Sequence, residues 1–171
     1  MLDLVMKRGK KSYLPKGEHI YRQGDKDGNL YAVASGLLKV YYTTNTGKEF
    51  VKSFIDAGGY IASISAMLNV DSCPFSIVAL EDSQLVCVTG DIMLDLKEKS
   101  SDDVSSINSA LLKLIQKKEQ REFEFLCLSA EERYIEFKKE YENLESRVSQ
   151  YDVARYLGIT PVALSRIRKR C

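Results

Sequence analysis

The chain has 171 residues, of which 44% are hydrophobic and 29% are charged, and its formal net charge is +1. This balance is typical of a folded protein and excludes a disordered chain. No apolar stretch reaches the roughly 18 residues that a membrane span needs, and the first residues lack the apolar core of a signal peptide. We therefore expect a cytoplasmic protein of one or two domains, with no membrane partner.

Nothing in the sequence indicates an enzyme or a metal site. The four cysteines, Cys73, Cys87, Cys127 and Cys171, are far apart and form no C-x-x-C pair, so we interpret them as structural thiols. The single histidine, His19, stands beside no nucleophile and leaves little for acid–base or metal chemistry. We predict no catalytic residue, no metal ligand and no cofactor.

Residues 1–100 are predicted to form an antiparallel β-roll, or jelly roll. Short segments rich in β-branched and aromatic residues alternate with turn signals such as Ser35-Gly36, which is typical of this architecture. The expected strands are 20–21, 30–34, 37–42, 50–55, 76–80 and 85–88, with a short helix within 61–68. Asp91 is predicted to cap a further short helix that extends to Leu96. With the helices that follow, the fold class is α+β.

A long helix is predicted from Ser101 to about Phe125, within a segment, 101–127, that we assign to dimerisation. Its apolar and charged residues recur at alternating spacings of three and four, as in a coiled-coil seam. The seam consists of Val104, Ile107, Leu111, Leu114, Lys118, Arg121 and Phe125. The first five are the candidate homodimer interface. The alternative is that the same stripe packs against the chain's own roll.

Residues 128–171 are predicted to form a helical domain that ends in a helix-turn-helix. Ser129 begins a capping box for a helix that ends near Tyr141. Ser149 caps a second helix, which stops at Gly158. Thr160 and Pro161 then supply the cap and first residue of a last helix, to about Arg170. Two short helices joined by Gly-Ile-Thr are typical of a DNA-binding motif.

The charge distribution favours a nucleic-acid partner for this end of the chain. Residues 147–171 carry six Lys or Arg and a single acidic residue, Asp152, whereas residues 91–146 are net acidic. A basic segment on a near-neutral chain is the electrostatic signature of a contact with DNA. The alternative is a protein-interaction module whose basic end binds an acidic protein.

The sequence resembles the Crp/Fnr family of bacterial transcription regulators, in the branch common in Bacteroidetes. The run from Val153 to Lys169 resembles the family's helix-turn-helix, and Pro15-Lys16-Gly17-Glu18 with Gln23-Gly24-Asp25 resembles its cyclic-nucleotide-binding-like roll. The resemblance implies a sensor roll, a dimerising helix and DNA recognition, with RNA polymerase as a protein partner. It gives as candidate DNA contacts Ser149, Gln150, Thr160, Pro161, Val162, Ser165, Arg166, Arg168 and Lys169. Arg166 matches the family's base-reading arginine, and the family's Arg-Glu pair at the helix start is replaced by Pro161 and Val162.

The roll departs from the family's nucleotide-binding pattern. Family members use a Gly-Glu pair to bind ribose and an Arg-Ser pair to bind phosphate. The corresponding stretches here read Tyr60-Ile61-Ala62-Ser63 and Cys73-Pro74-Phe75-Ser76, without the acid and without the arginine, and no arginine occurs between Arg22 and Arg121. A buried phosphate needs a charge-assisted partner, so we predict a regulator that is not gated by cyclic nucleotide. The alternative is a gated regulator in which Lys39, Lys48 or Lys52 replaces that arginine.

The sequence also gives no support for the other signals that members of the family sense. The cysteine group that holds an iron–sulfur cluster near the N-terminus in some members is missing, since the first cysteine is Cys73. A vestigial pocket for a small-molecule effector of unidentified chemistry would be lined by Tyr60, Ser63 and Ser76. The family also carries a helix before the first strand and a β-wing after the recognition helix, and we expect no counterpart of either in this sequence.

Overall fold

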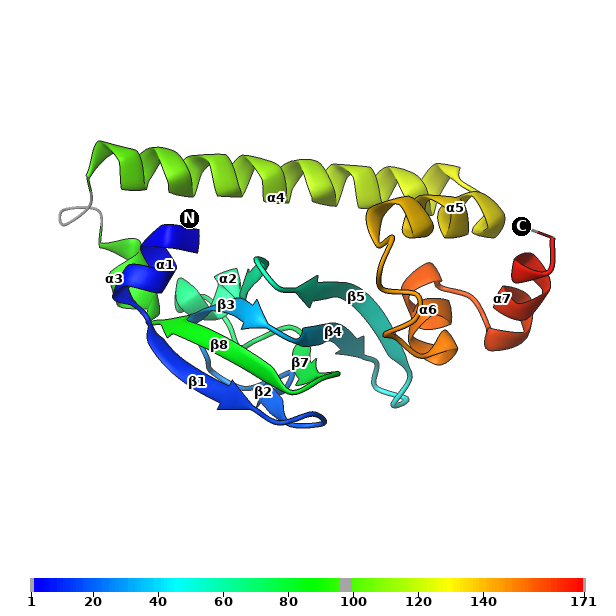
Figure 1. The fold of residues 1–171 in the computed structure, drawn as a ribbon, viewed down its shortest axis with the longest axis horizontal. Coiled ribbons are helices and arrows are strands. Elements are labelled where there is room, and N and C mark those ends of the chain that lie inside the picture. The colour runs from blue at the N-terminus through cyan, green and yellow to red at the C-terminus, as the bar shows by residue number, and fades with distance from the viewer. Residues whose placement is uncertain (1, 96–99, 171) are drawn as a thin grey trace. The chain divides into compact units, whose positions relative to one another are not determined.

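The computed structural model describes residues 2–95 and 100–170. Contacts within the chain divide it into two compact units, residues 1–108 and 109–171 (Figure 1). The boundary falls inside the long helix α4 (Ser101–Cys127), whereas the sequence placed boundaries at the two ends of that helix, after residues 100 and 127. The second half of α4 therefore has its contacts with the helices that follow.

The first unit contains two four-stranded antiparallel sheets, which confirms the predicted roll. One sheet has the order β1-β8-β3-β6 and the other the order β2-β7-β4-β5. Their strands are β1 (Lys10–Leu14), β2 (His19–Tyr21), β3 (Leu30–Ser35), β4 (Leu37–Thr43), β5 (Glu49–Asp56), β6 (Tyr60–Ala62), β7 (Ser76–Ala79) and β8 (Ser83–Val88). At the turn between β3 and β4, where the chain passes from one sheet to the other, Gly36 has φ +99°, and a Cβ there would overlap Ser83, so the turn requires glycine.

The central strands β3 and β8 of the first sheet are buried on both faces over most of their length. One face contributes Val33 and Leu85 to the cluster that fills the space between the sheets. The other face contributes Ala32 and Val86 to a second cluster, which also includes Val5 and is completed by Leu30, Met67, Val88 and Met93. Because both faces are covered, these strands are almost continuously apolar rather than alternating.

Three short helices flank the roll: α1 (Leu2–Arg8), α2 (Ile64–Met67) and α3 (Gly90–Leu94). The sequence indicated α2, but it missed α1, β1 and β6, so the expectation of no helix before the first strand is wrong. The predicted cap of α3 is also wrong, because Thr89 is the N-cap and Asp91 lies in the first turn. Leu96, the predicted end of that helix, lies outside the described residues.

The second unit consists of α4 from Ser109, α5 (Ala130–Glu140), α6 (Gln150–Leu157) and α7 (Pro161–Arg168). The capping box that begins α5 is complete, because Ser129 and Glu132 each accept a hydrogen bond from the other's backbone N–H. The rings of Phe137, Tyr141 and Tyr156 then pack with centroids 5.2–5.5 Å apart. These aromatic contacts hold α5 against α6.

Candidate nucleic-acid interface

Helix α6 begins at a side-chain cap that also involves a buried carboxylate. The Ser149 hydroxyl accepts from the Asp152 backbone N–H at 3.1 Å and donates to the Asp152 carboxylate at 2.7 Å. Val153, Ala154 and Leu157 then form the buried face of the helix. The cap fixes where α6 starts, and the small Ala154 allows close approach of the next helix.

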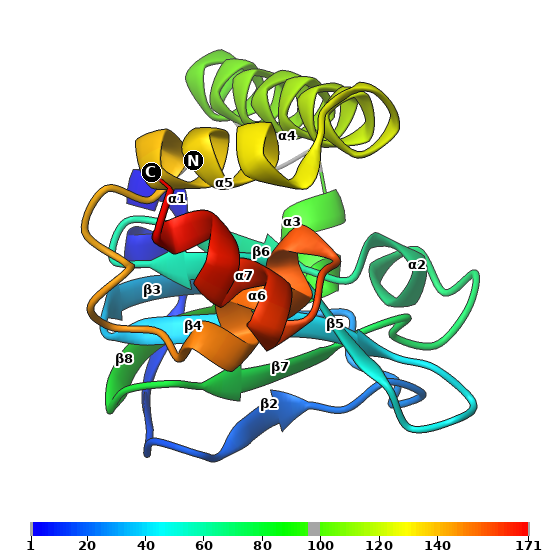
Figure 2. The ribbon, with the colours of Figure 1, turned by 90° about the vertical axis from the view of Figure 1, so that its right-hand side faces the viewer.

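The turn between α6 and α7 has the conformation that the sequence predicted. Gly158 is the C-cap of α6 in the left-handed region, with φ 71°, and the backbone N–H of Ile159 donates to the Ala154 carbonyl at 3.0 Å. The Thr160 hydroxyl accepts from the Ala163 N–H at 3.2 Å, and Pro161 occupies the first turn of α7. The two helices pack against each other as a helix-turn-helix (Figure 2).

Helix α7 separates its apolar residues from its polar ones. Leu164 and Ile167 are buried, and they lie on the face that packs inward. The exposed residues Val162, Ser165, Arg166 and Lys169 follow the spacing i, i+3, i+4, i+7, which places them on one side of the helix. Thus four of the nine predicted DNA contacts form a single exposed stripe.

Two other predicted DNA contacts already use their hydroxyls within the chain. The Ser149 hydroxyl donates to the Asp152 carboxylate and accepts from the Asp152 N–H. A phosphate at this position would therefore bind the backbone N–H groups of Ser149 and Gln150. The Thr160 oxygen accepts a hydrogen bond in the α7 cap, and its hydroxyl can donate a hydrogen bond to another group at the same time.

Arg168, a predicted phosphate contact, lies in an ion pair. Its Nη2 is 3.3 Å from the Glu145 carboxylate, with about a third of each side chain exposed. The Tyr134 hydroxyl donates to the same carboxylate at 2.6 Å. Burial, followed by this bond, raises the pKa of Tyr134 to about 12. Arg168 therefore already has an ion-pair partner, Glu145, within its own chain.

The predicted dimer seam divides into different environments along α4. Ile107 packs partly against the second cluster of the roll, which is the alternative that the sequence left open for this residue. Leu111 and Lys118 are exposed, and Val104 and Leu114 are half-buried. Exposed Leu112, Ile115 and Leu126 add apolar surface to the helix. The homodimer interface stays a prediction.

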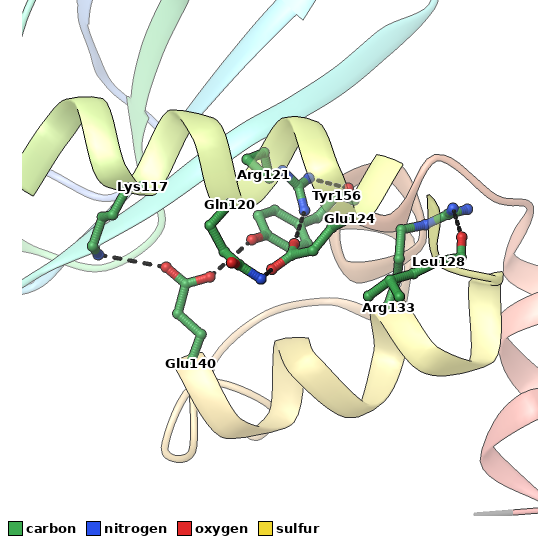
Figure 3. A network of polar contacts seen from close by, with 8 residues as sticks. All are labelled: Lys117, Gln120, Arg121, Glu124, Leu128, Arg133, Glu140 and Tyr156. Carbon is green, nitrogen blue, oxygen red and sulfur yellow. Dashed lines mark hydrogen bonds and ion pairs between the residues drawn. The ribbon is translucent and has the colours of Figure 1, made fainter. Parts of the chain in front are cut away.

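Arg121 and Phe125, which the sequence placed in the same seam, contact α6 of their own chain. The Arg121 guanidinium donates to the Tyr156 carbonyl (Figure 3). It lies 3.6 Å from the centroid of the Tyr156 ring and 4.5 Å from that of Phe125. Glu124 lies 3.7 Å from the same guanidinium. Sequence reasoning missed this cluster because periodicity alone does not say which partner a helix face contacts.

The three predicted effector-pocket residues lie at separate places in the roll. The Ser63 side chain is the N-cap of α2 and accepts from the Ala66 N–H, and the Ser76 hydroxyl accepts from the Gln23 N–H at 2.9 Å. Tyr60 is half-buried against the second cluster. Both hydroxyls already serve backbone groups, and the pocket stays a prediction.

Aromatic rings surround Phe75, which lies in the stretch 73–76 that we matched to the family's Arg-Ser pair. Phe75 is buried, with the rings of Tyr21 and Tyr42 at centroid distances of 5.9 and 6.2 Å. The Lys52 ammonium lies 4.5 Å from the Phe75 centroid. Of the other two candidate lysines, Lys39 pairs with Glu49 at 3.6 Å, and Lys48 lies over a different ring, Phe50.

The part of the chain that the structure describes holds neither a metal-binding cluster nor a membrane-spanning helix. Among residues 2–95 and 100–170, no group of three or more His, Cys, Asp or Glu side chains could hold a metal ion. Within the same ranges, no helix combines the length and the apolar character needed to cross a bilayer.

Comparison with known proteins gives consistent matches over both units. The model of the cyclic nucleotide-binding domain family matches residues 11–100. The transcriptional activator protein anr of Pseudomonas aeruginosa is 28% identical over 187 residues, covering 99% of this chain and 72% of that protein. The fumarate and nitrate reduction regulatory protein of Vibrio cholerae is also 28% identical, covering 99% and 70%.

Solved structures share the fold. FixK2 from Bradyrhizobium japonicum has a TM-score of 0.81 at 17% identity, covering 95% of this chain and 83% of that one. CLP, the c-di-GMP responsive global regulator of Xanthomonas campestris, has a TM-score of 0.78 at 16% identity, covering 99% and 89%. With a matched family domain, regulator relatives along the whole chain and a helix-turn-helix in place, the chain belongs to the Crp/Fnr family of transcription regulators.

Proposed function

We propose that this chain is a dimeric regulator that reads a specific DNA sequence through the exposed face of α7 and does so without cyclic nucleotide. The observation that carries the proposal is the stripe of Val162, Ser165, Arg166 and Lys169, held outward by the buried Leu164 and Ile167. Family members bind DNA and act as dimers, and a helix of this kind fits the major groove.

Each exposed residue of α7 receives a role from its chemistry. Arg166 presents the planar fork that binds the O6 and N7 of guanine. Val162 offers an apolar surface to a thymine methyl group, and Ser165 a hydroxyl to a base or phosphate. Lys169 is a point charge suited to phosphate. Thr160, Pro161, Gln150 and the Ser149 backbone lie at helix N-termini, where phosphates bind.

The dimer places two copies of α7 in successive major grooves. Half-sites of such motifs lie about 34–36 Å apart on one side of the duplex. We assign the dimer contact to Val104, Leu111, Leu114 and Lys118 of α4, and RNA polymerase is the expected partner of the DNA-bound dimer. Ile107, which the sequence also assigned to this contact, packs partly against the second cluster of the roll.

The chemistry of the roll supports independence from cyclic nucleotide. A cyclic phosphate needs a bidentate or charge-assisted donor. The stretch 73–76 that we match to the family's Arg-Ser pair holds no arginine, and the Lys52 ammonium lies 4.5 Å from the centroid of the Phe75 ring. A ligand of other chemistry remains an alternative effector for the roll.

The test is selection from a randomised duplex pool, followed by fluorescence anisotropy at two salt concentrations. The expected result is a two-fold symmetric motif, bound equally with and without cyclic AMP or cyclic GMP. Arg166→Ala should cost about 1–3 kcal/mol on that motif and little on random DNA. Lys169→Ala, the matched control, should weaken all DNA alike and reduce the salt slope by about one.

Three results would contradict the proposal in different ways. Binding only with a cyclic nucleotide would establish the gated alternative, and a nucleotide-dependent rise in Tm would support it independently. Selectivity that survives Arg166→Ala would remove Arg166 as the base reader. No DNA binding under any condition would favour the protein-interaction module.

A further inference from the structure

We propose that Arg121 is a positioning residue for DNA recognition: it fixes the helix-turn-helix on the end of α4 and thereby sets the geometry of the two recognition helices in the dimer. The proposal rests on the proposed function, since it concerns how α7 is held and not which base it reads. The residues concerned are the Arg121 cluster, which comprises Phe125 and the three residues drawn in Figure 3, Arg121, Glu124 and Tyr156.

The polar part of the Arg121 cluster caps a helix end. The Tyr156 carbonyl is one of the last four of α6, so no residue of α6 satisfies it. The Arg121 guanidinium donates to this carbonyl, and its positive charge lies where the α6 dipole is negative. The contact joins α4 to the one end of α6 that leads into the turn before α7.

The stacked part fixes the orientation of the contact. The guanidinium lies 3.6 Å from the Tyr156 ring centroid and 4.5 Å from the Phe125 centroid, and only 23% of the Arg121 side chain is exposed. A planar cation between two rings has fewer orientations than an ammonium would have. Glu124, itself buried, balances the charge at 3.7 Å and is held by Gln120 at 3.2 Å.

Phe125 extends the contact to the turn. A Cβ added at Gly158 would lie 3.0 Å from Cε1 of Phe125, so the ring packs directly on the turn backbone. Residues one helical turn apart on α4 therefore contact both the last turn of α6 and the residue that joins it to α7. Since only three residues separate the end of α6 from the start of α7, the direction of α7 follows from that of α6.

A second pair of contacts prevents rotation about the first. The Tyr156 hydroxyl donates to Glu140 of α5 at 3.1 Å, and Lys117 of α4 pairs with the same carboxylate at 3.4 Å. Tyr156 is thus held at its carbonyl, its ring and its hydroxyl. Tyr156 thus connects α6 to α4 directly through Arg121 and, by way of Glu140 of α5, to Lys117.

The experiment compares Arg121→Gln with Lys113→Gln, which removes the same charge from an exposed position of α4. The probes are the selected operator and versions with one base pair added to or removed from the spacer, which rotates the half-sites by about 35°. Wild type and Lys113→Gln should prefer the native spacer. Arg121→Gln should bind the native operator about 3- to 30-fold more weakly, lose the preference among spacers, and bind random DNA as wild type does.

A second measurement needs no DNA. Amide hydrogen exchange of the free protein should accelerate in Arg121→Gln around residues 156–160, whereas residues 134–137 keep the wild-type rate. Tyr156→Phe, which retains the ring and the carbonyl, should keep most of the protection at 156–160.

The outcomes separate the two proposals. A wild-type protein that selects no operator refutes the proposed function, and hydrogen exchange then decides the role of Arg121 alone. An Arg121→Gln protein with an intact spacer preference, or with unchanged exchange, refutes the positioning role. Uniformly faster exchange with equal weakening on all DNA also refutes it, because Arg121 would then contribute only to stability.

Discussion

Replacing Gly158 with alanine tests the geometry of the turn that carries α7. A side chain in the left-handed region, at φ 71°, costs about 1–2 kcal/mol. The new Cβ would also meet the Phe125 ring at 3.0 Å, and relieving such overpacking costs about 1–3 kcal/mol. We therefore expect the free energy of unfolding of the helical unit to fall by about 2–5 kcal/mol.

The matched control is Gly47→Ala. Gly47 also has a positive φ, 79°, but nothing lies within 4 Å of an added Cβ, so only the backbone cost of about 1–2 kcal/mol applies. Urea unfolding followed by far-UV circular dichroism measures each variant against wild type in the unit that contains it. If Gly158→Ala costs no more than Gly47→Ala, the packing of Phe125 on the turn is wrong. Stabilisation by about 0.4–1 kcal/mol, as at unstrained glycines, would refute the backbone argument as well.

Three further predictions concern other contacts. Glu145→Gln should strengthen DNA binding up to about fivefold and steepen the salt slope by about one, because the Glu145 carboxylate no longer competes with DNA for Arg168; an exposed ion pair is worth at most about 1 kcal/mol. Weaker binding in anisotropy titrations would mean that Glu145 orients Arg168 instead. Ser129→Ala should lower helical-unit stability by about 1 kcal/mol in urea unfolding through loss of the α5 cap, and an unchanged midpoint would contradict this. Burial and then Arg22 lower the pKa of His19 below 6.5. The unfolded chain therefore takes up the proton first as pH falls, and the roll loses stability below pH 6.5. His19→Gln should flatten this pH dependence of the urea midpoint, and an unaltered profile would exclude His19 as its source.

The helical motif could be predicted because its signals are local. Gly158 at a left-handed C-cap, Thr160 and Pro161 at the next helix start, and the Ser129 capping box each determine a helix end within a few residues. The alternation of short apolar segments and turns predicted the roll in the same way. These features depend on backbone chemistry, which neighbouring residues reveal.

The missed elements lack such signals. Strand β1 begins Lys10-Lys11-Ser12 and is mostly exposed at the sheet edge, so it has no apolar alternation. Charged edge strands protect a sheet against further pairing, and their strand character comes from the partner strand. Strand β6 has only three residues.

The contacts of Arg121 and Phe125 could not be predicted for a different reason. Both residues continue the heptad spacing of Leu111 and Leu114, and a seam is a property of one helix face. Whether that face meets a second copy or the same chain depends on the fold beyond the helix. The partner of Arg121 is the carbonyl of Tyr156, a contact between segments that no local pattern connects.

The sheet order has a consequence for the time course of folding. The last strand of the roll, β8, lies between β1 and β3 and pairs with both. Until β8 joins, β1 has no partner and one edge of β3 stays open. Contacts between segments distant in sequence form slowly, whereas neighbouring helices such as α6 and α7 associate fast. Open strand edges are where nascent chains aggregate, so the arrival of β8 determines when the roll becomes protected during synthesis.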